Sequence, residues 1–235
     1  MPEIIPINQH TWRIEDDGVR FFLLEGQQKA LLIDSGMNTP NAGAIARTLT
    51  ALPLNLLNTH ADPDHTAGNE AFGTFYMSPA EWENYHEIHH KNGTLLPVRD
   101  GDRIDLGGRE LVIIDLPGHT PGSIAVLDVA ARVLIGGDAI QDSHIFMFGA
   151  RRNMARYIES LTALWHLHRE KFDTVYPSHG TFPLPPSQIP RLIAGAGDIV
   201  SGKCVGKHIR FMAQDLIYYD VGCAGFLCDP TFLRE

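Results

Sequence analysis

Short apolar runs that end directly on a polar residue are the feature that most constrains the fold of this 235-residue chain. Residues 30–34 read ALLID and residues 54–58 read LNLLN. Runs of this length between turn residues are typical of buried strands. The stretch between them, 38–52, has Pro40 near its start and apolar residues at helical spacing, so we expect a helix there. This strand–helix–strand order predicts an α/β fold with ligands bound at strand ends.

Further helices and strands follow along the chain. Residues 78–91, SPAEWENYHEIHHK, favour a helix with Ser78 as its cap and Pro79 at its first position. Residues 153–172 form the clearest amphipathic pattern, and 186–203 favour another helix. Residues 101–140 read as a meander of strands, and the last thirty residues as two or three short strands. No low-complexity linker divides the chain, so we expect one domain, residues 1–235.

Composition excludes several classes of protein. The net charge of −9 disfavours nucleic acid as a partner. The three cysteines, Cys204, Cys223 and Cys228, show no CxxC spacing, which favours a reduced, cytoplasmic setting. No signal-peptide pattern opens the sequence and no apolar run reaches the length of a membrane span, so we expect no membrane partner.

The loop 58–70, NTHADPDHTAGNE, crowds two imidazoles and two carboxylates into six residues: His60, Asp62, Asp64 and His65. Asp, Asn and Pro are ordinary turn residues, so a solvated turn is one interpretation. A set of metal ligands is the other. The rest of the chain favours the second, because polar residues follow further strands in the same way: Asp34, His119, Asp138 and His179.

The donors themselves indicate the kind of metal. Imidazole with carboxylate suits zinc, iron or manganese rather than a structural thiolate zinc site. Seven donors are too many for one tetrahedral ion, but they fit two ions if one carboxylate bridges.

In these motifs the chain resembles the metallo-β-lactamase superfamily, in its glyoxalase II-like and lactonase-like hydrolase branch. That family has HxHxDH, then a His, a bridging Asp and a final His. The resemblance implies a four-layer αββα sandwich with the metals in a cleft at the sheet edges. It assigns His60, Asp62 and His119 to a first metal, Asp64, His65 and His179 to a second, and Asp138 to the bridge. Asp34 matches the early aspartate that supports the metal loop without ligating.

One residue departs from the pattern, because Asp62 stands where the family has its second histidine. A third carboxylate makes the site harder and favours iron or manganese. The flavodiiron branch similarly has a carboxylate there, so a diiron redox protein is one alternative. A second is that Asp62 is a tolerated substitution in a hydrolase. A third is that Asp62 fails to reach the metal, which leaves one ion or a catalytically degenerate binding protein.

We expect a hydrolase with two divalent ions, zinc first and iron or manganese possible, that activates a bridging water. The resemblance points to a small ester, thioester or lactone as substrate. Asp64 is the candidate catalytic residue that orients the nucleophile or passes on its proton. His144 and Tyr85 are candidate substrate-binding residues, although packing explains them equally well. A homodimer is the expected assembly if the chain associates.

Overall fold

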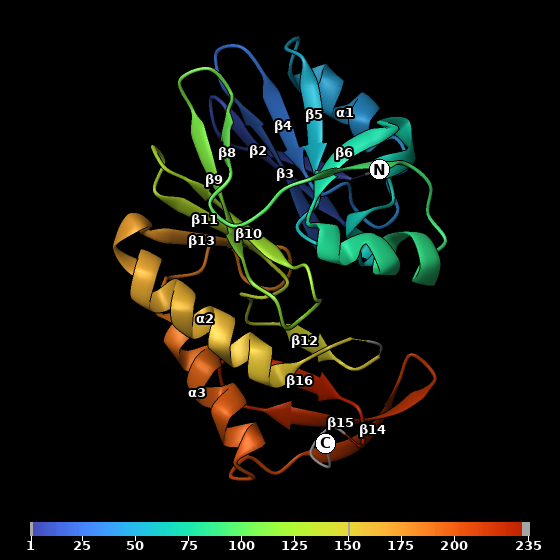
Figure 1. Ribbon diagram of the computed structural model, residues 1–235, viewed down its shortest axis with the longest axis vertical. Coiled ribbons are helices and arrows are strands. Elements are labelled where there is room, and N and C mark those ends of the chain that lie inside the picture. Colours follow the sequence, from blue (N-terminus) through green and yellow to red (C-terminus); the bar gives the residue numbers. More distant parts are fainter. Residues whose placement is uncertain (1, 150, 232–235) are drawn as a thin grey trace.

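The computed structural model describes residues 2–149 and 151–231 (Figure 1). The first sheet holds seven strands in chain order. Its first four strands pair antiparallel and the rest parallel. The strands are β1 (Glu3–Asn8), β2 (Thr11–Asp16), β3 (Val19–Glu25), β4 (Ala30–Ile33), β5 (Leu54–Leu57), β6 (Thr74–Met77) and β7 (Thr94–Pro97). The apolar runs 30–34 and 54–58 thus form neighbouring parallel strands, as predicted.

A second sheet has the order β13-β11-β10-β9-β8. Its strands are β8 (Arg103–Asp105), β9 (Glu110–Asp115), β10 (Ile124–Asp128), β11 (Val133–Gly137) and β13 (Thr174–Pro177). Only β11 and β13 pair parallel in this sheet as described. The predicted meander over 101–140 is therefore confirmed.

Three helices cover the two sheets: α1 (Ala42–Leu49), α2 (Met154–His168) and α3 (Gln188–Val200). Leu31 and Ile33 of the first sheet pack on Ile113 and Val126 of the second, which forms the central apolar layer. A second cluster joins α1 to the outer face of the first sheet. A third joins α2 and α3 to the second sheet. These layers confirm the predicted αββα sandwich, because each sheet buries one face on the other sheet and one on helices.

A small third sheet at the C-terminal end was not predicted as a separate unit. It has the order β12-β16-β15-β14, with β12 (His144–Met147), β14 (Lys207–Phe211), β15 (Gln214–Asp220) and β16 (Gly225–Cys228). It lies at the lower end of Figure 1, below α2 and to the right of α3. Phe226 and Cys228 of this sheet join the same apolar cluster as the two helices. The single domain over 1–235 stays a prediction.

The predicted helix over 78–91 is wrong in its form. The chain makes a 3-10 turn at Pro79–Glu81 and a π-helix at Glu83–Ile88. The wide turn is held by the amide of His89, which donates to the carbonyl of Asn84. His90 has a φ of +52°, a left-handed conformation that ends the helix.

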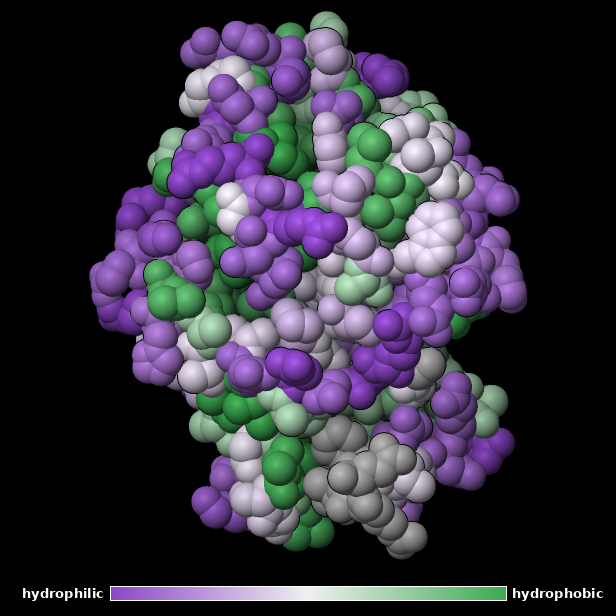
Figure 2. All heavy atoms as spheres, viewed as in Figure 1, coloured by the Kyte–Doolittle hydropathy of each residue, from purple (hydrophilic) through white to green (hydrophobic). Residues whose placement is uncertain are grey.

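Polar side chains cover most of the face in Figure 2, with apolar side chains gathered in smaller patches between them. Within the described ranges, no helix has both the length and the apolar composition needed to cross a bilayer.

Candidate metal centre

The seven predicted donors come together at one end of the first two sheets. The loop after β5, with a 3-10 turn at Pro63–His65, carries the crowded motif. Three further loops follow β9, β11 and β13 and carry one donor each. The side chains that meet are His60, Asp62, Asp64, His65, His119, Asp138 and His179.

The donors form two groups that share Asp138. In the described residues, one group is Asp64, His65, Asp138 and His179, and the other is His60, His119 and Asp138; the donor atoms of each lie within 4.8 Å of one another. Asp138 Oδ1 lies 3.2 Å from His65 Nε2 and 3.4 Å from His179 Nε2. Its Oδ2 lies 3.7 Å from His119 Nε2. The two carboxylate oxygens of Asp138 therefore face different groups, which is the arrangement that a bridging ligand needs.

Asp62 lies beside the second of these groups. Its Oδ2 is 3.2 Å from His119 Nε2 and 3.5 Å from His60 Nε2. Ligands about 2.0–2.1 Å from a tetrahedral zinc ion lie roughly 3.3 Å from one another. Asp62 therefore lies at ligand spacing from His60 and His119, although it belongs to neither of the two groups.

Each of the four imidazoles is fixed through its Nδ1 atom. Nδ1 of His65 donates to Asp34 Oδ2 at 2.9 Å. Nδ1 of His119 and of His179 donate to the carbonyls of Phe146 and Gly18. Nδ1 of His60 donates to the hydroxyl of Thr59, which itself donates to Asp34. Such bonds leave the Nε2 lone pair of each ring free for a metal.

The buried donor atoms lack other partners. Nε2 of His60, His65 and His119 and Oδ1 of Asp138 are buried, and none has a hydrogen-bond partner among the described residues. A buried polar atom without a partner costs free energy, so native proteins rarely leave one. The residues present therefore fit a pair of divalent ions, which would satisfy all four atoms.

Asp34 joins the strand end to the metal loop. It has a φ of +65° and is buried. Its Oδ1 accepts from the amide of Thr59 at 2.7 Å, while its Oδ2 accepts from His65 Nδ1. These contacts are those of a residue that supports the loop without ligating.

Arg152 is a site residue that the sequence analysis missed. Its Nη2 donates to Asp62 Oδ1 at 3.0 Å and to Oδ2 at 2.7 Å. Its Nη1 donates to the carbonyl of His119. Arg152 lies one residue before Asn153, the N-cap of α2, and nothing in its local sequence indicates a partner ninety residues away.

Glu81 is a second residue that was missed. Its carboxylate is fully buried and accepts from the amides of Ala61 and Gly122 at 2.9 and 2.7 Å. It also accepts from the side-chain amide of Asn84. Glu81 thus ties the loop of His60 to the loop of His119. The pattern Ser-x-x-Glu at 78–81 resembles a capping box, but the glutamate accepts hydrogen bonds from other loops instead of from the amide of Ser78.

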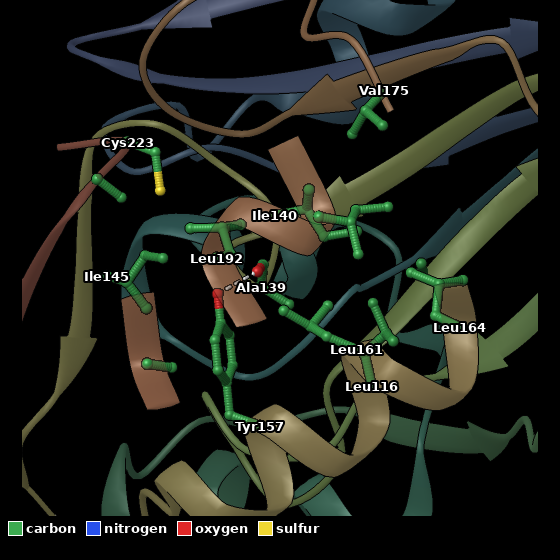
Figure 3. Packing of buried hydrophobic residues seen from close by; sticks show 14 of the residues in the cluster. Leu116, Ala139, Ile140, Ile145, Tyr157, Leu161, Leu164, Val175, Leu192 and Cys223 are labelled. Atoms are coloured by element: carbon green, nitrogen blue, oxygen red, sulfur yellow. Dashed lines mark hydrogen bonds between the residues drawn. The ribbon is translucent and has the colours of Figure 1, made fainter. Parts of the chain in front are cut away.

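The N-terminal part of α2 holds two of the ligand loops in place. The hydroxyl of Tyr157 donates to the carbonyl of Ala139, next to Asp138 (Figure 3). Gly118 lies so close to α2 that a Cβ atom there would be 2.4 Å from Tyr157 Cα. The amide of Asn153 donates to the carbonyl of Gly118. The loops of His119 and Asp138 are therefore positioned by one helix.

Charge sets the protonation of the cluster. Burial raises the pKa of Asp62, but the charge of Arg152, together with His60 and His119, outweighs burial and holds that pKa well below its ordinary value. Burial lowers the pKa of His119, and Arg152 lowers it further. Burial also lowers the pKa of His179, but Asp138 and Asp64 outweigh it and raise the pKa to about 10. His119 is therefore a neutral donor, whereas a metal must displace a proton from His179.

The cluster is open on one side. The side chains of Asp64 and His179 are 27% and 22% exposed, whereas His60 and His119 are 1% exposed. A substrate can therefore reach the cluster past Asp64 and His179. His89 is half-buried nearby, and the charges of Asp62 and Arg152 act on its pKa, which burial lowers.

The two predicted substrate residues lie elsewhere. Tyr85 is fully buried, packs on Phe75 and donates its hydroxyl to the carbonyl of Asn92. It offers no surface to a substrate because the core encloses it. His144 is exposed on β12 and packs edge-on against Tyr218. It belongs to the C-terminal sheet and is not among the clustered donors.

Comparison with known proteins gives the same picture. The family profile described as "Metallo-beta-lactamase superfamily" matches residues 14–179. The acyl-coenzyme A thioesterase MBLAC2 of Gallus gallus is 28% identical over 196 residues, which cover 67% of this chain and 71% of that protein. A hydroxyacylglutathione hydrolase of Hyphomonas neptunium is 32% identical over 142 residues, which cover 57% of this chain. The chain spans about half the length of that relative, 52%.

Solved structures share the fold. A metallo-β-lactamase from Pontibacter korlensis matches with a TM-score of 0.72 at 18% identity, covering 84% of this chain and 100% of that one. A metallo-β-lactamase from Hirschia baltica matches with a TM-score of 0.64 at 16% identity, covering 82% and 96%. At such identities the likeness concerns the fold.

Proposed function

Because the chain belongs to the metallo-β-lactamase superfamily, we propose that it is a hydrolase with two divalent metal ions that cleaves a small thioester. The relatives named above are a thioesterase and a hydrolase of a glutathione thioester, which supports this class of substrate. The observation that carries the proposal is the shared carboxylate of Asp138, whose two oxygens face two groups of orphaned imidazole nitrogens.

We assign His60, Asp62, His119 and Asp138 to one ion, and Asp64, His65, His179 and Asp138 to the other. When bound, divalent ions supply hydroxide near neutral pH and polarise a carbonyl oxygen. Zinc is the first candidate, with iron and manganese as the others, since imidazoles and carboxylates suit all three metals.

Asp64 has the role of proton acceptor in this proposal. Its pKa is held below its ordinary value because His65 and His179 outweigh the effect of burial, so it is a carboxylate at neutral pH. Its Oδ2 faces the imidazoles of His65 and His179, and Oδ1 is left to hold the attacking water. As the water oxygen bonds to the carbonyl carbon, Asp64 takes one proton from the water; the C–S bond then breaks, and Asp64 passes that proton to the leaving thiolate sulfur, which regenerates its carboxylate.

A cavity beside Arg152 is the candidate space for the rest of the substrate. It has a volume of about 510 Å³ and is lined by Met147, Met154, Arg151 and Arg152, among others. Methionine side chains adapt to flexible acyl groups, and arginines bind anionic groups. Arg152 lines this cavity and also contacts Asp62, whereas none of the seven donors is among its described lining residues.

The diiron redox alternative depended on the extra negative charge of Asp62. Arg152 lies on that carboxylate and offsets its charge. We therefore do not propose redox chemistry.

The proposal is tested by elemental analysis of untagged protein, followed by assays on thioesters, lactones and esters. We expect two zinc ions per chain and turnover of hydroxyacylglutathione or acyl-coenzyme A above that of acyl-homoserine lactone and p-nitrophenyl acetate. Asp64→Asn is expected to lower kcat by about 100-fold or more. The matched control is Asp105→Asn, a substitution on β8 away from the cluster. Protein that holds two ions but turns over none of these substrates would indicate a binding protein and overturn the proposal.

A further inference from the structure

The metal centre carries one more carboxylate than the family pattern, and the structure pairs that carboxylate with a cation. Asp62 replaces a neutral imidazole and adds one negative charge beside the group of His60, His119 and Asp138. We propose that Arg152 is a positioning residue that completes the first metal site, by holding Asp62 Oδ2 beside His60 and His119 and cancelling its charge. The inference rests on the proposed metal centre.

The contacts allow Asp62 to bind Arg152 and a metal at once. A carboxylate has about four acceptor positions on its two oxygens. Arg152 Nη2 occupies one position on each oxygen, at 3.0 and 2.7 Å. Oδ2 still lies 3.2 Å from His119 Nε2 and 3.5 Å from His60 Nε2. The second lone pair of Oδ2 is therefore free for the ion that the two imidazoles also face.

Arg152 holds a second ligand loop as well. Its Nη1 donates to the main-chain carbonyl of His119. The side chains of Arg152 and Asp62 are only 14% and 10% exposed, so solvent screens the pair weakly. A guanidinium stays charged at every pH a folded protein tolerates. One side chain thus fixes the positions of Asp62 and His119 relative to each other.

The charges balance with Arg152 in place. Three ligand carboxylates, those of Asp62, Asp64 and Asp138, carry three negative charges, and Arg152 reduces the total to two. A site with histidine at position 62 and no arginine would carry the same total. The Asp62–Arg152 pair thus has the same net charge as a neutral imidazole, namely zero. We therefore expect this centre to retain zinc.

The test is a double-mutant cycle on zinc binding. We expect Arg152→Met to bind the first zinc about 10- to 100-fold more weakly, as when other supports of metal ligands are removed. Asp62→His alone should also weaken it, because Arg152 is then unpaired beside the ion. The double variant Asp62→His with Arg152→Met should regain two tightly bound ions. Arg152→Lys should rescue part of the affinity, because it restores the charge but not the shape of the guanidinium.

The measurements are zinc content by elemental analysis and the zinc dissociation constant by competition with a chromophoric chelator. Arg132→Met is the matched control, because it breaks an exposed arginine–carboxylate pair with Asp173 that precedes β11 and β13, at the strand ends opposite to Asp138 and His179. Circular dichroism and urea unfolding report whether each variant is folded. If Arg152→Met is unfolded, the zinc dissociation constants of Arg152→Lys and of the double variant are compared with that of the wild-type chain instead.

Two results would overturn the inference while leaving the proposed function intact. One is tighter zinc binding by Arg152→Met, which would mean that Arg152 holds Asp62 away from the metal. The other is a double variant that binds no better than the single ones. A wild-type chain that takes up no zinc at all would overturn both proposals.

Discussion

The guanidinium of Arg152 donates to both carboxylate oxygens of Asp62, at 3.0 and 2.7 Å, from ninety residues further along the chain. This ion pair lies against the imidazole of His119, whose Nε2 is 3.2 Å from Asp62 Oδ2. The residue that departs from the family pattern is therefore the residue that gains a charged partner. The aspartate that replaces a histidine at position 62 adds a negative charge, and the guanidinium of Arg152 compensates that charge in the structure.

Removing the metal is expected to destabilise the chain. Without ions, three imidazole nitrogens and one carboxylate oxygen are buried without hydrogen-bond partners in the part of the chain that the structure describes. A ligand at a free concentration of 100 times its Kd stabilises the native state by about 2.7 kcal/mol. Urea unfolding before and after exhaustive chelation should show a loss of at least that size, restored by added zinc. An unchanged free energy of unfolding would contradict the assignment of these atoms as ligands.

Glu81→Gln should lower both stability and zinc affinity. The carboxylate accepts from the amides of Ala61 and Gly122, and a neutral amide oxygen can replace only one of its two acceptor atoms. We expect a loss of about 1–3 kcal/mol in the free energy of unfolding. Glu83→Gln is the control, since among the described residues the side chain of Glu83 makes an exposed ion pair with Arg151 and no other, and the substitution should change stability by less than about 0.5 kcal/mol. Equal effects of the two substitutions would argue against Glu81 as the link between the loops.

Gly118→Ala should be severe. The φ of Gly118 is +144°, and a Cβ atom would lie 2.4 Å from the main-chain N and Cα of Tyr157. Strain and overpacking together should cost at least about 3 kcal/mol. Gly101→Ala isolates the backbone strain from the overpacking, because Gly101 has a φ of +82° and open space around its Cα. The melting temperature of Gly118→Ala should therefore be clearly lower than that of Gly101→Ala. Similar melting temperatures would mean that α2 shifts to make room for the added methyl group.

The stability of the metal-free chain should depend on pH through His179. Its folded pKa of about 10 lies above the ordinary value of 6.5, because Asp138 and Asp64 outweigh burial. A raised pKa means that the folded chain binds the proton more tightly, so this stabilisation is complete below about pH 6.5 and is lost as pH rises toward 10. Urea unfolding between pH 6.5 and 10 should show the decline. His179→Gln should reduce the slope; the part that survives is expected from His65, whose pKa Asp64 and Asp138 raise against the effect of burial, and an unchanged slope would contradict the role of His179.

The sequence by itself determined the strands and the donors. Short apolar runs predicted β4 and β5, and the position of Asp34, His119, Asp138 and His179 directly after such runs predicted that they would share one edge. This reasoning works because a strand end is a local property, and parallel strands bring their carboxyl ends to the same side of a sheet. Helical periodicity predicted α2 in the same local way.

Only the tertiary structure decided which residues support the donors. Arg152 and Glu81 act across ninety and forty-one residues, and a long-range contact leaves no periodic signal in the sequence. The segment around Tyr85 shows that a local pattern can also mislead. It predicted a regular helix, but the chain forms a π-helix at Glu83–Ile88, and Tyr85 is buried in the core. Local patterns fix which side chains stand at strand ends, whereas packing between distant segments fixes which charges and hydrogen bonds those side chains receive.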